Sequence, residues 1–179
     1  NITKVSIYKR QWLGSWGYLD FHANAQAQWN KVPFQMLIMP PINLSYFEQE
    51  ETVSMMKDWE FLNDRQVFWA LSWDMNGKLL NRIPLIKKLK WREWLAIKGV
   101  YGHLTDKNNP FLEKNKNDDT IFLFPKGSDV MGNTPYWECV VGVHNIFKFF
   151  AVEYVRRLTY INRPGIHKGG VRFNFMMSF

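Results

Sequence analysis

The chain has 179 residues, of which 46% are hydrophobic, 17% aromatic and 22% charged, and its mean hydropathy is −0.32. Its apolar runs are far shorter than the roughly 20 residues of a membrane-spanning helix, which excludes a helical span, whereas many aromatic rings in a polar chain are typical of a barrel with one face in lipid. The net charge of +7 suggests a nucleic-acid partner, but only residues 87–92 form a dense basic run, which we interpret as a solvated turn beside a membrane.

The first two segments alternate between apolar and polar side chains, which predicts strands whose two faces meet different environments. Residues 2–12 do so with moderate regularity, and residues 17–29 do so throughout. In the second segment every odd position is apolar or glycine, whereas Asp20 and His22 lie on the opposite face. We therefore predict that Asp20 and His22 face a water-filled lumen.

Two less regular segments follow. Residues 34–47 are predicted to form a strand that Pro40 and Pro41 interrupt, because proline cannot donate to a sheet ladder. Residues 52–61 are predicted to form another strand of moderate regularity. Both are expected to belong to the same sheet.

The segment 66–76 divides cleanly into two faces. Its predicted lipid-facing residues are Val67, Trp69, Leu71 and Trp73. Asp74 lies on the other face, which we expect to line the lumen. Residues 91–101 repeat the pattern, although Glu93 departs from it near one end.

Three segments complete the predicted sheet. Residues 136–143 and 149–161 alternate less well, since Arg156 falls on the apolar face of the second. Residues 170–179 give the cleanest alternation in the chain. Arg172 falls on their polar face and is predicted to point into the lumen.

Together these segments predict an all-β protein, an antiparallel transmembrane β-barrel with about nine strands in this chain, many of them long enough for a tilted crossing of the bilayer. Residues 104–134 are too polar and turn-rich to cross a membrane, and counting back from a periplasmic C-terminus makes them a long extracellular loop. Because single-chain bacterial barrels close with an even number of strands, we expect further strands before Asn1. Residues 1–179 would then be the C-terminal portion of a larger barrel domain.

The end of the chain is its most specific motif. A glycine, an amphipathic strand and a terminal aromatic residue match the C-terminal strand that outer-membrane proteins present to their assembly machinery. The residues of this predicted assembly signal are Gly170, Val171, Phe173, Phe175, Met177 and Phe179. The alternative is an edge strand of a soluble sandwich, but so long an apolar edge would be an aggregation hazard in water.

No motif for catalysis or cofactor binding stands out. The sequence contains no serine elbow, no pair of histidines at metal spacing and no phosphate loop. Its charged and histidine side chains fall mainly on polar strand faces, where a water-filled lumen accounts for them. The single cysteine, Cys139, excludes an intrachain disulfide and a cysteine-based zinc site. We therefore predict no enzymatic activity, no metal and no cofactor.

Several stretches resemble one family of Bacteroidetes outer-membrane proteins. They are WEFLNDR at 59–65, LLNRIPLIKKLKWRE at 79–93, GVHNIFK at 142–148 and the C-terminal strand. Members of that family join an N-terminal carboxypeptidase-regulatory-like domain to a barrel of unknown function, and the barrel is similar to the surface-antigen superfamily of assembly and translocation barrels. The resemblance implies a barrel of about 16 strands, of which this chain is roughly the last half.

The resemblance also implies a function in the outer membrane of a Gram-negative bacterium, namely protein assembly or translocation that acts on polypeptides or lipids without catalysis. Two alternatives stay open, a passive channel or structural subunit of an envelope complex, and a soluble lipid-binding or nucleic-acid-binding β-protein. The expected partners are outer-membrane lipids and lipopolysaccharide, the barrel-assembly machinery and other envelope proteins, but no nucleic acid.

Overall fold

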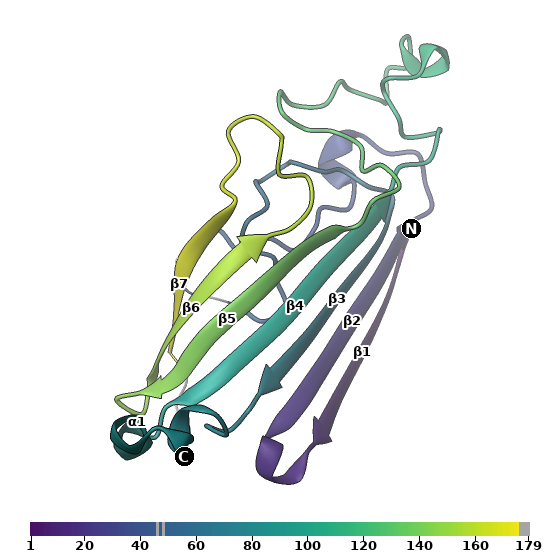
Figure 1. Cartoon of the computed structure of the whole chain (residues 1–179). Coiled ribbons are helices and arrows are strands. Elements are labelled where there is room, and N and C mark those ends of the chain that lie inside the picture. Colours follow the sequence, from purple (N-terminus) through teal and green to yellow (C-terminus); the bar gives the residue numbers. More distant parts are fainter. Residues whose placement is uncertain (46, 48, 176–179) are drawn as a thin grey trace.

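The computed structural model describes residues 1–45, 47 and 49–175. Its strands form one antiparallel sheet of seven (Figure 1). The strands are β1 (Ile2–Trp12), β2 (Tyr18–Gln28), β3 (Arg65–Asp74), β4 (Arg92–His103), β5 (Tyr136–Ile146), β6 (Phe150–Arg157) and β7 (Gly169–Phe175). Each strand pairs with its neighbours in the sequence, and no pairing joins β1 to β7 within the described residues. The protein is therefore all-β, as predicted, and its described sheet is open.

Helical structure is confined to short connections in the described part of the chain. The elements are α1 (Pro84–Leu89) and the 3-10 turns η1 (Gly14–Trp16), η2 (Phe34–Met36), η3 (Leu80–Arg82) and η4 (Glu113–Asn115). Among the described residues, no helix has the length and apolar character that a membrane span requires. Figure 1 shows α1 at the same end of the sheet as the β1–β2 and β5–β6 turns, whereas residues 104–135 connect strands at the opposite end.

The register of the strands separates two chemically different faces, because directly paired residues on neighbouring strands point to the same side of a sheet. One row of paired residues starts at Gln11 on β1 and is apolar from β2 to β7: Leu19, Trp73, Leu95, Val141, Tyr154 and Val171. A row on the other side is mostly polar: Tyr8, His22, Ala70, Lys98, Glu138 and Arg157. We call the side of the first row the open face and the side of the second row the covered face.

The covered face is packed by the inserted segment, which we define as residues 29–64 between β2 and β3. Val53, Met56 and Phe61 of this segment form a buried cluster with side chains of β3, β4 and β5. Met55 is buried in a second cluster with side chains of β4, β5 and β6. The hydrophobic core therefore lies between the inserted segment and the sheet, whereas the apolar row of the open face is exposed or half-buried.

The prediction of about nine strands is wrong, because the described residues of 34–47 and 52–61 form no strand and the sheet has seven. Ser54 and Met55 are both buried, so burial does not alternate there as it would in a strand with one exposed face. Their N–H groups bind the carboxylate of Glu138 and not a neighbouring strand. A side chain from a distant part of the sequence thus replaces the ladder that the periodicity implied.

The seven other predicted strands are confirmed within the described residues, with changes at their ends. Of the strand predicted over residues 170–179, positions 176–179 lie outside the described residues. The strand predicted over residues 149–161 ends at Arg157. Arg156 is exposed on the open face, where it pairs with Cys139 and Gly169 close to the end of β6. Arg156 therefore lies on the same face as the apolar residue Tyr154, as the alternation of residues 149–161 predicts.

Candidate functional site

The covered face carries charged side chains that are almost completely buried beneath the inserted segment. They are Asp20, Asp74, Lys98, Glu138, His144, Glu153 and Arg157, together with Glu60 and Asp64 of the inserted segment itself. Burial of a charge is costly unless the group is paired and hydrogen-bonded. The contacts of these groups therefore decide what this region, our candidate site, can do.

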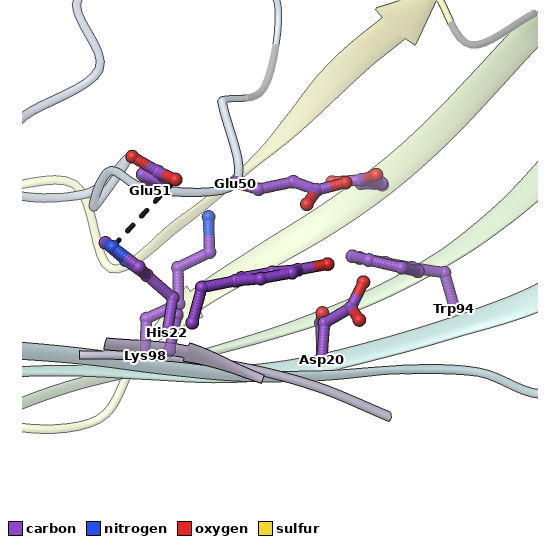
Figure 2. Close-up of a pocket in the computed structure, with 10 residues that line it drawn as sticks. Asp20, His22, Glu50, Glu51, Trp94 and Lys98 are labelled. Atoms are coloured by element: carbon purple, nitrogen blue, oxygen red, sulfur yellow. Dashed lines mark ion pairs between the residues drawn. The ribbon is translucent and has the colours of Figure 1, made fainter. Parts of the chain in front are cut away.

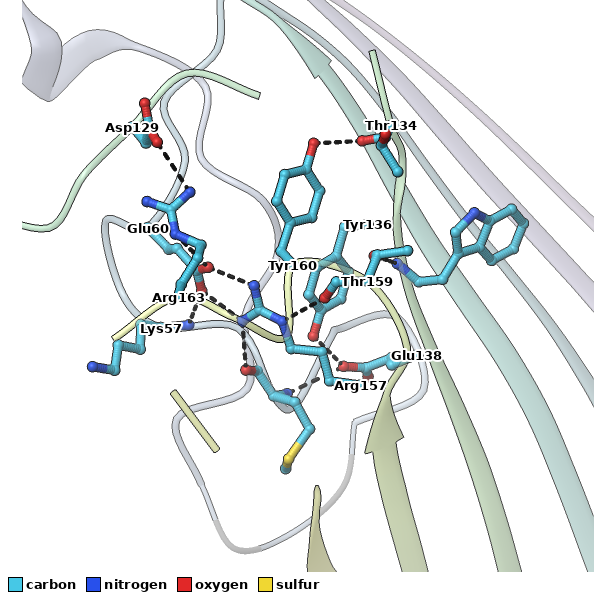
Figure 3. Close-up of polar contacts among 12 residues, drawn as sticks. Lys57, Glu60, Asp129, Thr134, Tyr136, Glu138, Arg157, Thr159, Tyr160 and Arg163 are labelled. Carbon is cyan, nitrogen blue, oxygen red and sulfur yellow. Dashed lines mark hydrogen bonds and ion pairs between the residues drawn. The ribbon is translucent and has the colours of Figure 1, made fainter. Parts of the chain in front are cut away.

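The strongest link of the candidate site joins Arg157 on β6 to Glu60 of the inserted segment (Figure 3). Arg157 Nη1 donates to Glu60 Oε2 at 2.9 Å, Nη2 donates to Oε1 at 2.6 Å, and the side chains are 0% and 2% exposed. Arg163 approaches the same carboxylate at 3.6 Å, and the backbone N–H of Lys57 donates to it at 3.0 Å. This bidentate, charge-assisted pair fixes the end of the inserted segment against the sheet.

A second carboxylate, that of Glu138 on β5, holds the neighbouring part of the inserted segment. Its oxygens accept the N–H of Ser54 at 2.9 and 3.1 Å and the N–H of Met55 at 3.1 Å. The hydroxyl of Tyr136 donates to it at 2.9 Å (Figure 3). Because Glu138 is fully buried, these donors take the place of water around its carboxylate.

Lys98 on β4 provides a third anchor. Its ammonium group donates to the carbonyl oxygens of Gln49 at 3.1 Å and Thr52 at 2.9 Å. A cavity of about 30 Å³ lies between this turn and the covered face (Figure 2). The cavity has room for roughly one or two water molecules, but not for an organic substrate.

Asp20 and His22 line the same cavity from β2. The carboxylate of Asp20 accepts hydrogen bonds from the guanidinium of Arg10 at 2.6 and 2.5 Å, and His22 Nε2 lies 3.9 Å from Glu51 Oε1. Figure 2 shows both side chains directed from the sheet toward the turn that carries Glu50 and Glu51. These polar groups meet on the covered face.

His144 on β5 and Glu153 on β6 form a buried histidine–carboxylate pair. His144 Nε2 lies 2.7 Å from Glu153 Oε1, and the two side chains are 4% and 1% exposed. The indole of Trp94 stacks on the imidazole with 4.8 Å between ring centroids. A general base must reach a proton of its substrate. Glu153 lines the cavity of about 30 Å³, which has no room for an organic substrate, so we assign the pair to holding β5 and β6 together.

A larger pocket of about 520 Å³ lies between the inserted segment and β7. Asn43, Ser45, Gly170 and Arg172 are among the residues that line it. Arg172 Nη2 donates to the carbonyl oxygen of Ser54 at 3.0 Å. Within the described residues no group of three or more His, Cys, Asp or Glu side chains could hold a metal ion.

The inserted segment is also tied to the long connection between β4 and β5. The carboxylate of Asp64 accepts the N–H of Thr105 at 3.1 Å, the hydroxyl of the same residue, and the side-chain amide of Asn108 at 2.9 Å. Farther along, Lys31 donates to Asp118, and this hydrogen bond lowers the pKa of the Asp118 carboxyl. The two longest connections therefore pack together at one end of the sheet.

The structure places the predicted site residues on two opposite faces. Val67, Trp69, Leu71 and Trp73 lie on the open face and are exposed or half-buried. Asp20, His22, Asp74 and Arg172 lie on the covered face. Of the predicted assembly signal, Gly170, Val171, Phe173 and Phe175 belong to β7, whereas Met177 and Phe179 lie outside the described residues.

Lys98 and Glu138 are not among the residues that the sequence singles out, and Glu60 is one of the charged side chains that the sequence predicts to line a water-filled lumen. Lys98 and Glu138 occupy polar positions of regular strands, which a water-filled lumen explains equally well. Glu60 falls in a segment that the sequence predicts as a strand. One feature of the sequence could have identified Glu60, because it lies between two large aromatic residues, Trp59 and Phe61. If the rings are buried, the acid between them needs a partner.

No protein-family model, curated protein sequence or solved structure matches the chain. The geometry of the two faces therefore carries the functional argument.

Proposed function

We propose that this chain forms part of the wall of a transmembrane β-barrel in the outer membrane of a Gram-negative bacterium. In this proposal the open face contacts lipid and the covered face points into the lumen. The contrast between the two faces carries the proposal, because an apolar row crosses the sheet from Leu19 to Val171 while the buried charges gather on the other side. A bilayer is the environment in which an apolar outer face and a polar inner face are both stable.

Aromatic residues near the strand ends support the same proposal. Trp16 is exposed at the β1–β2 turn, and the indole N–H of Trp73 on the open face donates to the Trp16 carbonyl at 2.9 Å. Trp29 is exposed at the opposite end of the sheet, where its indole N–H donates to Thr3 Oγ1 at 2.9 Å. Indoles with an apolar body and a hydrogen-bonded N–H are typical of the two membrane interfaces.

We propose further that the barrel is of the assembly or translocation type and acts on polypeptides or lipids without a catalytic residue. The support is the inserted segment, which occupies the covered face and is held by Arg157, Glu138 and Lys98. A passive channel needs an open water path, whereas buried ion pairs that bind a segment inside the wall give an interior with one defined arrangement. The inserted segment could move away from the sheet when a client binds, because its anchors Lys98, Glu138 and Arg157 lie on the strands and not on the segment itself.

The partners in this proposal are the lipids and lipopolysaccharide of the outer membrane and the barrel-assembly machinery. The machinery would recognise the C-terminal segment that includes β7, whose edge away from β6 meets only an isolated bridge between Phe47 and Phe173 among the described residues. Strand edges must be paired in a bilayer, so this edge is where a further strand would join. Nucleic acid is not expected, because the dense basic run of residues 87–92 is confined to one end of the sheet and the other Lys and Arg residues are scattered along the chain.

Two measurements on the full-length protein in lipid vesicles and planar bilayers test the proposed function. The first is the resting conductance, and the second is the rate at which a small urea-denatured outer-membrane barrel inserts into the vesicles. We expect low conductance together with faster insertion than into empty vesicles. A steadily open conductance with no effect on insertion would instead identify a passive channel.

A further inference from the structure

The connection between β3 and β4 has an unusual charge. Residues 75–91, which we call the basic connection, contain five Lys or Arg residues and no Asp or Glu. The neighbouring β5–β6 turn adds Lys148. In contrast, the inserted segment contains two Lys and six Asp or Glu residues, and the lysines of residues 104–134 are interspersed with acidic residues. These two connections at the opposite end of the sheet therefore lack this excess of positive charge.

The basic connection also exposes large apolar side chains between its cations. Leu79, Ile83, Leu85 and Leu89 are 45%, 48%, 78% and 52% exposed. Leu85 and Leu89 are four residues apart on α1 and therefore share one side of that helix. Several large apolar side chains exposed within one short connection are typical of a surface that contacts a partner or a membrane.

Two side chains tie the basic connection to the edge of the open face. Glu93 occupies the same side of β4 as Leu95, and its Oε1 accepts the N–H of Leu79 at 2.8 Å and also that of Leu80. At the C-terminal end of the basic connection, Asn145 Nδ2 on β5 donates to the carbonyl oxygen of Lys90 at 2.7 Å. The exposed leucines are thereby held where the apolar surface of the sheet ends.

We infer that the basic connection is an interfacial anchor that binds the headgroups of anionic phospholipids in the leaflet bordering the short turns. This inference rests on the proposed function, since it requires the open face to lie in a bilayer. The leucines would enter the boundary between headgroups and acyl chains, and the lysines would extend to the phosphates. Charge complementarity favours this occupant, because the connection carries five cations and no acidic residue of its own. The adjoining carboxylate of Glu93 accepts backbone N–H groups of Leu79 and Leu80. The excess positive charge attracts an anionic surface and disfavours a cationic one.

The first test measures lipid selectivity with the full-length protein in bilayers that contain spin-labelled phosphatidylglycerol or phosphatidylcholine. The test variant combines Lys87→Gln, Lys88→Gln and Lys90→Gln. The control combines Lys107→Gln, Lys114→Gln and Lys116→Gln, which removes the same charge from the opposite end. Each lysine near an anionic surface contributes up to about fivefold in affinity, so we expect the preference for phosphatidylglycerol to fall at least about fivefold in the test variant alone.

The second test measures depth in the bilayer with nitroxides at Leu85→Cys and Lys87→Cys in a Cys139→Ser background. We expect the label at position 85 to be relaxed by oxygen from the bilayer and the label at position 87 by a water-soluble nickel complex. Unchanged lipid selectivity in the test variant, an equal loss in the control, or water exposure at both positions overturns this inference while the barrel proposal stands. A protein that does not insert into bilayers overturns both.

Discussion

The guanidinium group of Arg157 and the carboxylate of Glu60, 97 residues apart in the sequence, form two hydrogen bonds of 2.9 and 2.6 Å. Arg157 belongs to the sheet and Glu60 to the inserted segment, so the pair joins the two layers of the described structure. Both side chains are almost fully buried. Because an ion pair of this kind is costly to break by removing one partner, it is the natural point at which to test how firmly the segment is held.

Glu60→Gln leaves the buried guanidinium of Arg157 without its counter-charge. We expect the variant to lose about 3–5 kcal/mol of the free energy of unfolding and to show protease cleavage within residues 49–64. Unfolding by guanidinium chloride, followed by tryptophan fluorescence, measures the first effect. Asp106→Asn is the matched control, because its carboxylate pairs with Lys114 on the exposed surface, and surface pairs contribute little. Equal stability of the two variants would show that the buried pair does not hold the segment.

A charge on the open face should destabilise the protein in a bilayer. Leu71→Arg places a guanidinium on the apolar side of β3 and is expected to cost about 2–4 kcal/mol if the residue is near the bilayer centre. Ser6→Arg adds the same group to an exposed position of the covered face and should cost much less. Refolding into lipid vesicles at several denaturant concentrations gives both values. A larger cost for Ser6→Arg would reverse the assignment of the faces.

The connection formed by residues 104–134 is predicted to lie outside the cell. A cysteine introduced at Asn117, which is exposed, should react with a membrane-impermeant maleimide in intact cells, with Cys139→Ser as the background. A cysteine at Ser15, in the turn at the other end of the sheet, should react only after the outer membrane is permeabilised. The opposite pattern would invert the topology.

Deletion of Phe179 should impair assembly more than stability. The predicted assembly signal loses its terminal aromatic residue, whereas the pairing between β6 and the described residues of β7 is kept. We expect a lower yield in the outer membrane, with normal heat-modifiable gel mobility of the molecules that do insert. Normal yield of the deletion variant would remove the assignment of this segment as a recognition element.

The two-residue alternation of apolar and polar side chains predicts most of the sheet, because each strand meets a different environment on its two sides. Residues 66–76 show this best, since their alternation corresponds to the observed faces of β3. The alternation wrongly predicts a strand at Ser54 and Met55, because their backbone N–H groups bind the side chain of Glu138, more than 80 residues away. No local pattern can register such a partner.

The candidate site was accessible to sequence reasoning only in part, for the same physical reason. Asp20 and His22 lie on the polar face that their strand predicts, yet their neighbours across the cavity come from the inserted segment. Arg157 is one of several polar residues on its strand until the structure brings Glu60 to it. Pairing across a fold depends on topology, which periodicity does not encode.

The most direct test of the central claim is a nitroxide scan along β3, from Gln66 to Trp73, in the protein reconstituted into a bilayer. We predict that accessibility to oxygen alternates with a period of two residues, with maxima at Val67, Trp69, Leu71 and Trp73. The even positions should show low accessibility both to oxygen and to a water-soluble nickel complex, because they are buried under the inserted segment. Maxima at the even positions, or no alternation along the strand, would contradict a barrel wall whose open face lies in lipid.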